Sequence, residues 1–371
     1  MNQTSLPVYL NGLFYLLAFV LALAFSLYGV PMARRAALKL GIVDRPDGRL
    51  KRQREPVPYL GGLAIYLSFL AALALTYEFS QEVLGLILGG TLTLLLGLID
   101  DFSVLTPREK IFGQLVAISA LVKAGITIQL TFLPGWVALP LTVLWLLAIT
   151  NAFNLIDVMD GLSAGVAFTA CLALFGVALL NGRPMIAILT AALAGSILGF
   201  LRYNFEPARI YLGDSGSLFL GLMLGALAMI GSYSQENLLA CLAPLVILGV
   251  PLFDLLFVMY VRHRRGLPLM QGSPDHFALR LKRWRLSTRQ TTLLSYLLSA
   301  LLGGVGLAIM RASAWGAGLL LATIAASALL AGHLLGRMGE TTEKTEARED
   351  RLGEVGLSPS PHGVDLYVRK G

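Results

Sequence analysis

Residues 136–180 read WVALPLTVLWLLAITNAFNLIDVMDGLSAGVAFTACLALFGVALL. Two runs without charge, near 136–152 and 162–180, flank a short polar turn that carries Asp157 and Asp160. Each run is apolar on every side and approaches the roughly 20 residues that a membrane-spanning helix needs. The stretch therefore predicts a helical hairpin in a lipid bilayer, with two carboxylates where the chain turns.

The same pattern fills most of the chain. Further apolar runs lie near 8–28, 58–77, 83–99, 111–128, 185–201, 212–231, 238–261, 291–310 and 315–336. Only 14% of the 371 residues are charged, against about 25% in soluble domains, which excludes one large soluble helical core. We predict an all-α, polytopic membrane protein with about eleven transmembrane helices. Three runs are short or interrupted, near 111–128, 136–152 and 185–201, so ten crossings stay an alternative.

The basic residues predict the orientation. Of the 29 lysines and arginines, all but three fall in alternate loops or in the tail; the exceptions are Lys123, Arg183 and Arg311. The positive-inside rule then places the N-terminus outside and the C-terminus in the cytoplasm. The first basic cluster follows the first apolar run, which favours a retained helix over a cleaved signal peptide. Residues 1–336 are predicted to be the membrane domain and 337–371 a charged cytoplasmic tail, forming a short surface helix or remaining disordered.

Six aspartates lie at or near the ends of the predicted spans: Asp100, Asp101, Asp157, Asp160, Asp214 and Asp254. The predicted topology puts all six at the cytoplasmic face, whereas a transporter more often places ionisable groups near the bilayer midplane. Asn154 precedes Asp157 and Asp160 at intervals of three, so a helical turn would put these side chains on one face. The pattern predicts one site that meets a soluble substrate and the membrane together.

Helix capping could explain Asp160 or Asp214 without any site. It does not explain Asp100 and Asp101, because the C-terminal end of a helix disfavours negative charge. Two carboxylates there need a cation or another positive group. A cluster of oxygen ligands suits Mg²⁺, which substrate phosphates often complete. Loop residues such as Lys51 and Arg280 could neutralise phosphate; most basic residues need only topology as their explanation, so nucleic acid is not an expected partner.

Six segments in order resemble the polyprenyl-phosphate N-acetylhexosamine-1-phosphate transferases, glycosyltransferase family 4, which include the phospho-MurNAc-pentapeptide translocase. They are DRPDGRLKRQREPVPYLGG, GLIDD, NAFNLIDVMDGLSAG, YNFEPARIYLGDSGSLFLG, PLFDLLFVMYVRHRRG and SPDHFALRL, within residues 41–285. The resemblance implies transfer of a sugar-1-phosphate, expected to be GlcNAc-1-phosphate, from a UDP-sugar to undecaprenyl phosphate, with release of UMP. It also implies Mg²⁺, with Mn²⁺ as an alternative, a multi-pass inner-membrane enzyme with a cytoplasmic active site, and compatibility with a homodimer.

The resemblance also assigns roles to single residues. Asp214 is the implied metal ligand, with Asn154 beside it. Asp100 and Asp101 are implied to handle the lipid phosphate, with Asp100 the better candidate for a base. The implied nucleotide-binding and diphosphate-binding residues are Asn154, Asp157 and Asp160, and Asn204 matches a further active-site position. Lys51 matches the basic residue of the first loop, and His276 and Arg280 match the last loop, which is implied to face sugar and phosphate. Lys51 and His276 are implied catalytic residues, like Asp100 and Asp101, and Arg280 is implied to bind substrate.

The sequence departs from the family at two places. Gln53 stands where histidine is frequent, and none of the four histidines in the chain is adjacent to another. The second departure disfavours the pentapeptide translocase, which stays the alternative function, followed by a polytopic transporter. Pro244 and Pro251 predict a bend in the ninth run, which either opens a lipid groove near Asp254 or is an ordinary kink. The residues leave open whether transfer is direct or passes through a phospho-aspartate.

Overall fold

Helices form nearly all the regular structure in the computed structural model, which describes residues 8–44, 56–103, 105–130, 132–231, 233, 237–268 and 275–354. The helices are α1 (Val8–Leu40), α2 (Gly61–Thr76), α3 (Gln81–Phe102), α4 (Pro107–Lys123), α5 (Gly135–Ile156), α6 (Leu162–Leu180), α7 (Pro184–Asn204), α8 (Gly213–Met229), η2 (Leu238–Leu242), α9 (Ala243–Ile247), α10 (Gly249–Arg264), α11 (Phe277–Arg283), α12 (Thr288–Arg311) and α13 (Ala314–Glu354). Within the described ranges, two short strands, β1 (Val43–Asp44) and β2 (Val57–Pro58), pair antiparallel. The predicted all-α class is confirmed.

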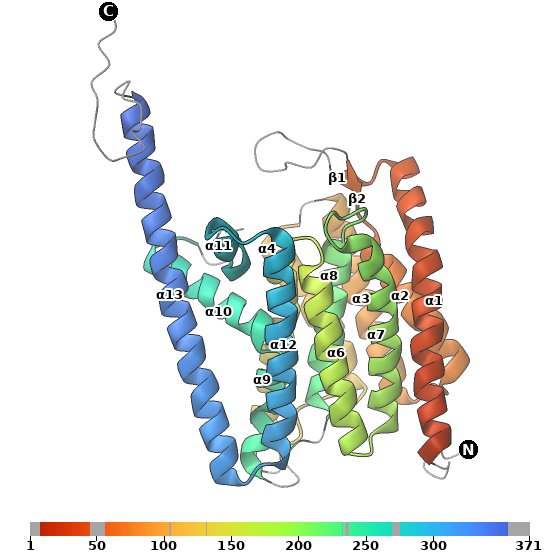
Figure 1. Ribbon diagram of the computed structural model, residues 1–371. Coiled ribbons are helices and arrows are strands. Elements are labelled where there is room, and N and C mark those ends of the chain that lie inside the picture. Colours follow the sequence, from red (N-terminus) through yellow and green to blue (C-terminus); the bar gives the residue numbers. More distant parts are fainter. Residues whose placement is uncertain are drawn as a thin grey trace, which may run out of the picture.

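Most of the helices stand side by side as a bundle, with α1 starting at one end and α13 extending past the other (Figure 1). Ten of the eleven predicted apolar runs fall on one helix each, and the ninth is divided among η2, α9 and α10. Seven helices are long and apolar enough to cross a membrane, and the bent pair η2–α9 and α10 makes eight if it counts as one span. The shorter apolar helices α2 and α8 stand among them. The chain is thus a multi-pass membrane protein, while eleven crossings and an outside N-terminus stay predictions.

The centre of the bundle is α8, whose residues are buried from Gly213 to Ala228 except Asp214. Small residues let its neighbours approach closely. A Cβ added at Gly62 of α2 would collide with the backbone of Gly216, and one at Gly97 of α3 would collide with Ser215. These contacts fix the start of α8 beside the end of α3, and that junction builds the site described below.

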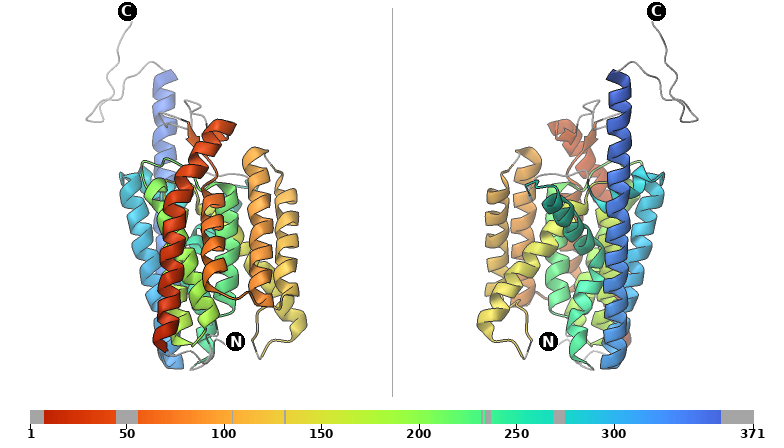
Figure 2. Two further views of the ribbon diagram at one scale, coloured as in Figure 1. Left: turned by 90° about the vertical axis from the view of Figure 1, so that its right-hand side faces the viewer. Right: turned by 90° about the vertical axis from the view of Figure 1, so that its left-hand side faces the viewer.

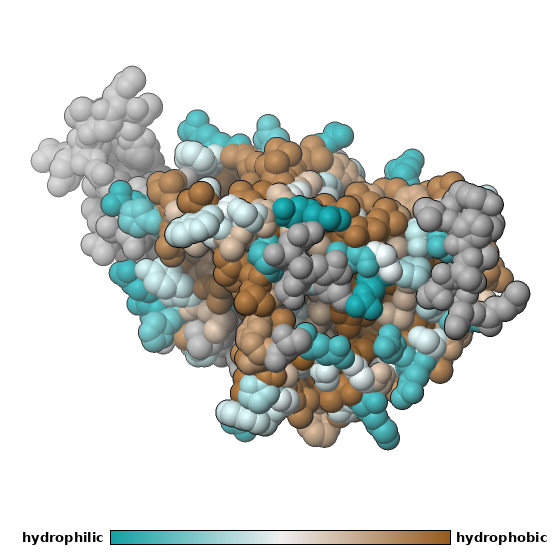
Figure 3. Space-filling view, turned by 90° about the horizontal axis from the view of Figure 1, so that it is seen from below, coloured by the Kyte–Doolittle hydropathy of each residue, from teal (hydrophilic) through white to brown (hydrophobic). Residues whose placement is uncertain are grey.

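The outer helices present large apolar side chains to their surroundings. Leu16 of α1 is 59% exposed, and Trp315 and Leu329 of α13 are 87% and 77% exposed. A view along the bundle from the end where α1 begins shows hydrophobic side chains over much of the surface, with hydrophilic ones scattered between them (Figure 3). Apolar surface on this scale suits helices that face lipid.

The ninth predicted run is broken as its prolines predict. Its two parts meet at 75°, with Pro244 in the first turn of α9 and Pro251 early in α10. Beyond the break α10 leaves the bundle and runs toward α13 (Figure 1). At the C-terminus, α13 continues as a helix past 337 to Glu354, so no helix end marks the predicted boundary between membrane domain and tail.

Candidate active site

A cavity of about 730 Å³ lies at the end of the bundle where α3, α5 and α7 end and α6 and α8 begin. Its polar and charged lining comprises Asp44, Tyr59, Asp100, Asp101, Lys110, Asp157, Asp160, Asn204, Tyr211 and Asp214. Five of the six aspartates predicted to share a site line it, and Asp254 does not. The cavity therefore gathers carboxylates that are far apart in the sequence, from the ends of different helices.

Asp101 closes the start of α8. Its Oδ1 accepts from the Asp214 backbone N–H at 2.8 Å and its Oδ2 from the Ser215 N–H at 3.2 Å. Gly213 has φ 74°, and a Cβ there would lie 2.7 Å from the Asp101 carboxylate, so only glycine lets the two helices meet this closely. The positive end of the α8 dipole thus faces the carboxylate at the C-terminal end of α3. This contact supplies a positive partner for one member of the aspartate pair.

The other positive partner is Lys110, near the start of α4. Its Nζ lies 2.5 Å from an oxygen of Asp100 and 2.5 Å from an oxygen of Asp214, and donates to Asn154 Oδ1 at 3.3 Å. Asp100 also accepts from the Leu105 N–H at 2.8 Å. Asn154 Nδ2 in turn donates to Asp214 Oδ1 at 2.9 Å. One ammonium group therefore joins oxygen ligands from α3, α5 and α8.

The turn between α5 and α6 carries the remaining acids. Asp160 Oδ2 accepts from the Ala208 N–H at 2.9 Å, and the α6 N-cap is Gly161, without a side-chain cap. The capping explanation of Asp160 is therefore wrong. Asn204 holds the turn, since its Oδ1 accepts from Gly161 N–H at 3.0 Å and its Nδ2 donates to Ile210 O at 2.9 Å.

Asp157 lies at the end of α5, where its surroundings disfavour the ionised form of its carboxyl group. Burial, followed by the charges of Asp214, Asp101 and Asp160, raises the pKa of Asp157 well above its usual range. Burial also raises the pKa of Asp160, although its bond from Ala208 opposes this. Negative charge is in excess here, so a cation or a positively charged ligand would be stabilised.

The residues fit a divalent ion that is only partly held by protein. Asp214 and Asn154, the implied metal ligands, lie together, and their oxygens are of the type that Mg²⁺ prefers. No group of three or more His, Cys, Asp or Glu side chains in the described ranges is spaced as a complete metal cage. That suits an ion bound by one or two carboxylates and completed by water and phosphate. Asp214 does not cap α8 with its side chain, so capping does not account for it either.

His276 and Arg280 form a separate cluster on α10 and α11. His276 Nδ1 lies 2.7 Å from Asp254 Oδ2, and Arg280 Nη2 donates to Asp275 Oδ1 at 2.7 Å. Arg280 also donates to the Leu335 carbonyl of α13 at 2.8 Å. All four ionisable side chains are buried, and neither His276 nor Arg280 lines the acidic cavity. The structure thus joins His276 to Asp254 but joins neither His276 nor Arg280 to the five predicted aspartates of the cavity.

Sequence reasoning missed Lys110 and the aromatic wall of the cavity. Lys110 was assigned only to the positive-inside pattern; its place ten residues after Asp100, one helix on, is the signal that could have singled it out. Tyr59 and Tyr211 stand with ring centroids 5.9 Å apart beside Asp44. Lys51 lies outside the described residues, and its role stays a prediction.

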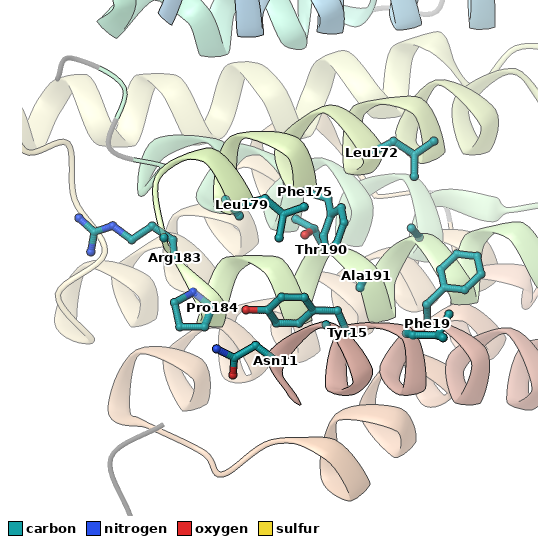
Figure 4. Close-up of a pocket in the computed structure, with 15 residues that line it drawn as sticks. Asn11, Tyr15, Phe19, Leu172, Phe175, Leu179, Arg183, Pro184, Thr190 and Ala191 are labelled. Atoms are coloured by element: carbon teal, nitrogen blue, oxygen red, sulfur yellow. The ribbon is translucent and has the colours of Figure 1, made fainter. Parts of the chain in front are cut away.

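A second crevice, of about 690 Å³, lies between α1, α6 and α7 near the start of α1. Tyr15 and Phe19 form one wall and Leu172 and Phe175 the other, with Arg183 at one end (Figure 4). Among the described residues that line this crevice, Arg183 is the one charged residue. Such a lining suits hydrocarbon, so the acidic cavity is the candidate active site.

Comparison with known proteins identifies the family of the chain. The family described as glycosyl transferase family 4 matches residues 83–232, a range that holds all the described cavity residues except Asp44 and Tyr59. A probable undecaprenyl-phosphate N-acetylglucosaminyl 1-phosphate transferase of Bacillus subtilis is 34% identical over 307 residues, covering 80% of this chain and 86% of the relative. The chain belongs to glycosyl transferase family 4.

Two further relatives carry names that differ in the group transferred. A decaprenyl-phosphate N-acetylglucosaminephosphotransferase of Mycolicibacterium smegmatis is 33% identical over 302 residues, covering 71% of this chain and 74% of the relative. A phospho-N-acetylmuramoyl-pentapeptide-transferase of Halalkalibacterium halodurans is 34% identical over 298 residues, covering 72% and 88%. The first name gives an N-acetylglucosamine phosphate group and a polyprenyl phosphate, and the second gives a phospho-N-acetylmuramoyl-pentapeptide group.

Proposed function

We propose that this member of glycosyl transferase family 4 transfers GlcNAc-1-phosphate from UDP-GlcNAc to undecaprenyl phosphate, releasing UMP and starting a lipid-linked cell-envelope polysaccharide. The observation that carries the proposal is the acidic cavity, where Asp100, Asp214 and Asn154 surround Lys110 at one end of an apolar bundle. A cavity at a helix end, beside lipid, suits one soluble substrate and one membrane substrate. The names of the relatives support the transferred group and a polyprenyl-phosphate acceptor.

The difficulty of this reaction is charge repulsion, because both substrates are anionic. In the direct route, an oxygen of the lipid phosphate bonds to the β-phosphorus of the donor. The bond from that phosphorus to the bridging oxygen breaks, and UMP leaves with the electron pair. Lys110 would donate to phosphate oxygens at this point. Asp100 would orient the lipid phosphate or accept its proton, a small task since the second pKa of a phosphate monoester is ~6.

Asp214 and Asn154 would hold Mg²⁺, which supplies charge neutralisation for the diphosphate and the leaving group. Asp101 acts at one remove, because its bonds to the first turn of α8 set the direction of Asp214. Asp157 and Asp160 would face the nucleotide and diphosphate from the α5–α6 turn. We place this face of the protein in the cytoplasm, with eleven crossings, because nearly all the basic residues fall in alternate loops or the tail.

The test uses the purified chain in nanodiscs with UDP-GlcNAc, undecaprenyl phosphate and Mg²⁺. We expect UMP to appear only when lipid phosphate and Mg²⁺ are both present, and the product to be a lipid-linked GlcNAc diphosphate. Release of UMP without lipid, or none with any donor, would overturn the proposal. UDP-GalNAc and UDP-MurNAc-pentapeptide in parallel reactions decide the sugar, since the pentapeptide enzyme is an equally similar relative by identity.

A further inference from the structure

A reciprocal pair of amides links α4 to α5 inside the bundle. Asn151 Nδ2 donates to Gln114 Oε1 at 2.7 Å, and Gln114 Nε2 donates back to Asn151 Oδ1 at 3.3 Å. Asn151 also donates to the Leu147 carbonyl at 2.8 Å. Gln114 is completely buried, and burying amides costs free energy unless their hydrogen bonds are made. Two leucines would hold the helices at a similar distance without that cost. Packing of α4 against α5 alone therefore does not explain why amides occupy these two positions.

The pair lies one helical turn from the acidic cavity. Gln114 follows Lys110 by four residues on α4, and Asn151 precedes Asn154 by three on α5, so each amide shares a helix face with one of these site residues. The two helices are therefore joined by two polar contacts in succession. The first is the amide pair and the second is the hydrogen bond from Lys110 to Asn154.

Of the helices that meet at the site, α4 is the one whose rotation toward the site is least constrained by helix packing. Helix α5 is pressed against α8, where a Cβ at Gly221 would lie 2.7 Å from Thr150 Cα. Helix α4 stands with α3 at one edge of the bundle (Figure 2), packs along α3, and touches α5 over a much shorter stretch. Packing on α3 leaves the rotation of α4 toward α5 to directional contacts, and hydrogen bonds between buried amides specify such a register better than apolar contacts do.

We propose that Gln114 and Asn151 are positioning residues for Lys110. By setting the rotation of α4 against α5, the pair keeps the Lys110 ammonium between Asp100 and Asp214, where it meets the phosphates of the donor. This inference rests on the proposed function for its catalytic readout. It assigns a task to two side chains that do not line the cavity.

The decisive variant removes both partners at once. Gln114→Leu with Asn151→Leu leaves no unpaired amide between the side chains, so we expect folding to be retained, whereas either single change leaves a buried polar group unsatisfied. A matched control removes another interhelical contact that is remote from α4. The Thr169 hydroxyl donates to Ser299 Oγ at 2.7 Å between α6 and α12, and Thr169→Val with Ser299→Ala deletes it.

We expect the double leucine variant to lose about 10–100-fold in kcat/KM for UDP-GlcNAc, the range found for residues that orient ligands indirectly. The control variant should keep its activity within about twofold. The same leucine changes in a Lys110→Gln background should cost nothing further, because the pair acts through Lys110. Full activity of the double leucine variant, or an equal loss in the Lys110→Gln background, would overturn the inference.

A second measurement separates this inference from the proposed function. Hydrogen exchange by mass spectrometry should show faster exchange in residues 107–114 of the double leucine variant and unchanged exchange in α6 and α12. If the wild type makes no UMP, the proposed function fails, and unchanged exchange in 107–114 would overturn the inference on its own. If the wild type is active and the exchange changes without any loss of turnover, the inference fails and the proposed function stands.

Discussion

The acidic cavity and the cluster on α10 and α11 are both built from charged side chains, yet they handle charge in opposite ways. In the cluster, the side chains of Asp254, Asp275 and Arg280 are 0%, 2% and 1% exposed. In the cavity, those of Lys110 and Asp214 are 19% and 35% exposed. The cluster has paired its charges away from solvent, while the cavity presents its charges to an opening.

The cluster and the cavity also differ in how many partners their acidic side chains have. Asp254 is hydrogen-bonded to the His276 ring, and Asp275 has both Arg280 and Arg265 within 3.2 Å. The described cavity lining has six aspartates but a single basic residue, Lys110. Paired and buried charges fix structure, whereas excess charge beside an opening needs a ligand. The difference supports the proposal that the cavity binds substrate and cation, whereas the contacts of the cluster hold α10, α11 and α13 together.

The largest expected effect comes from changing the cavity at Asp214. Asp214→Asn keeps the shape but removes the charge that would hold Mg²⁺, so we expect UMP release to fall by at least about 10²–10³-fold. The unfolding temperature should stay equal or rise, because one of several crowded carboxylates is gone. Scanning fluorimetry and the UMP assay measure both; a variant with wild-type turnover would remove Asp214 from the metal site.

A smaller effect on turnover is expected at Asp101, which holds the first turn of α8 and thereby positions Asp214. Asp101→Asn loses the charge that faces the α8 dipole and turns an NH₂ group toward a backbone N–H of α8. We expect a loss of about 1–2 kcal/mol in the free energy of unfolding and a fall of about 10-fold in turnover as Asp214 shifts. Asp101→Glu is the comparison variant, and normal stability in Asp101→Asn would contradict the capping role.

In the cluster on α10 and α11, we expect a substitution to lower stability more than it lowers turnover. Asp254→Asn disturbs the buried hydrogen bonds of Asp254 with the His276 ring and the Phe277 N–H, which should cost about 1–3 kcal/mol of stability. Turnover per folded molecule should change by only a few fold, because neither residue lines the cavity. Chemical unfolding in mild detergent and the UMP assay on the folded fraction give the two quantities. A loss of turnover at full stability would return His276 to the catalytic role that the family resemblance implies.

The fold class and the gathering of five aspartates at one end of the bundle could be predicted from the sequence. Apolar runs report helices in lipid directly, because the bilayer fixes their length and excludes charge. Asp100, Asp157 and Asp214 each sit at the end of such a run, so alternation of the runs alone brings them to one end of the bundle. The bend between α9 and α10, which lies between Pro244 and Pro251, was equally readable, since proline removes a helix hydrogen bond.

Contacts between helices could not be read in the same way. Lys110 looks like any other basic residue after a span, and its meeting with Asp214 depends on how α4 is rotated. The separation of His276 from the aspartates depends on the direction that α10 takes after its 75° bend, which no local pattern encodes. Asp101 needed the packing of Gly97 on Ser215 to become visible as the cap of α8.

The smallest expected effect tests the excess charge of the cavity itself. Burial and neighbouring carboxylates raise the pKa of Asp157, so its ionised form destabilises the folded protein at neutral pH. Asp157→Asn should therefore raise the free energy of unfolding at pH 7 without Mg²⁺, because the amide carries no charge that burial and the neighbouring carboxylates would disfavour.

The sign of its pH dependence follows from proton binding. The folded wild type binds this proton more tightly than the unfolded chain, so lowering the pH through the raised folded pKa stabilises the wild type and removes the advantage of Asp157→Asn. Added Mg²⁺ should shrink the advantage at pH 7, because a cation offsets the same charges. Thermal unfolding at pH 7 and near pH 4, with and without Mg²⁺, measures all three differences. If Asp157→Asn is destabilising at pH 7 in the absence of Mg²⁺, the cavity already neutralises its charge and the contrast with the paired cluster is lost.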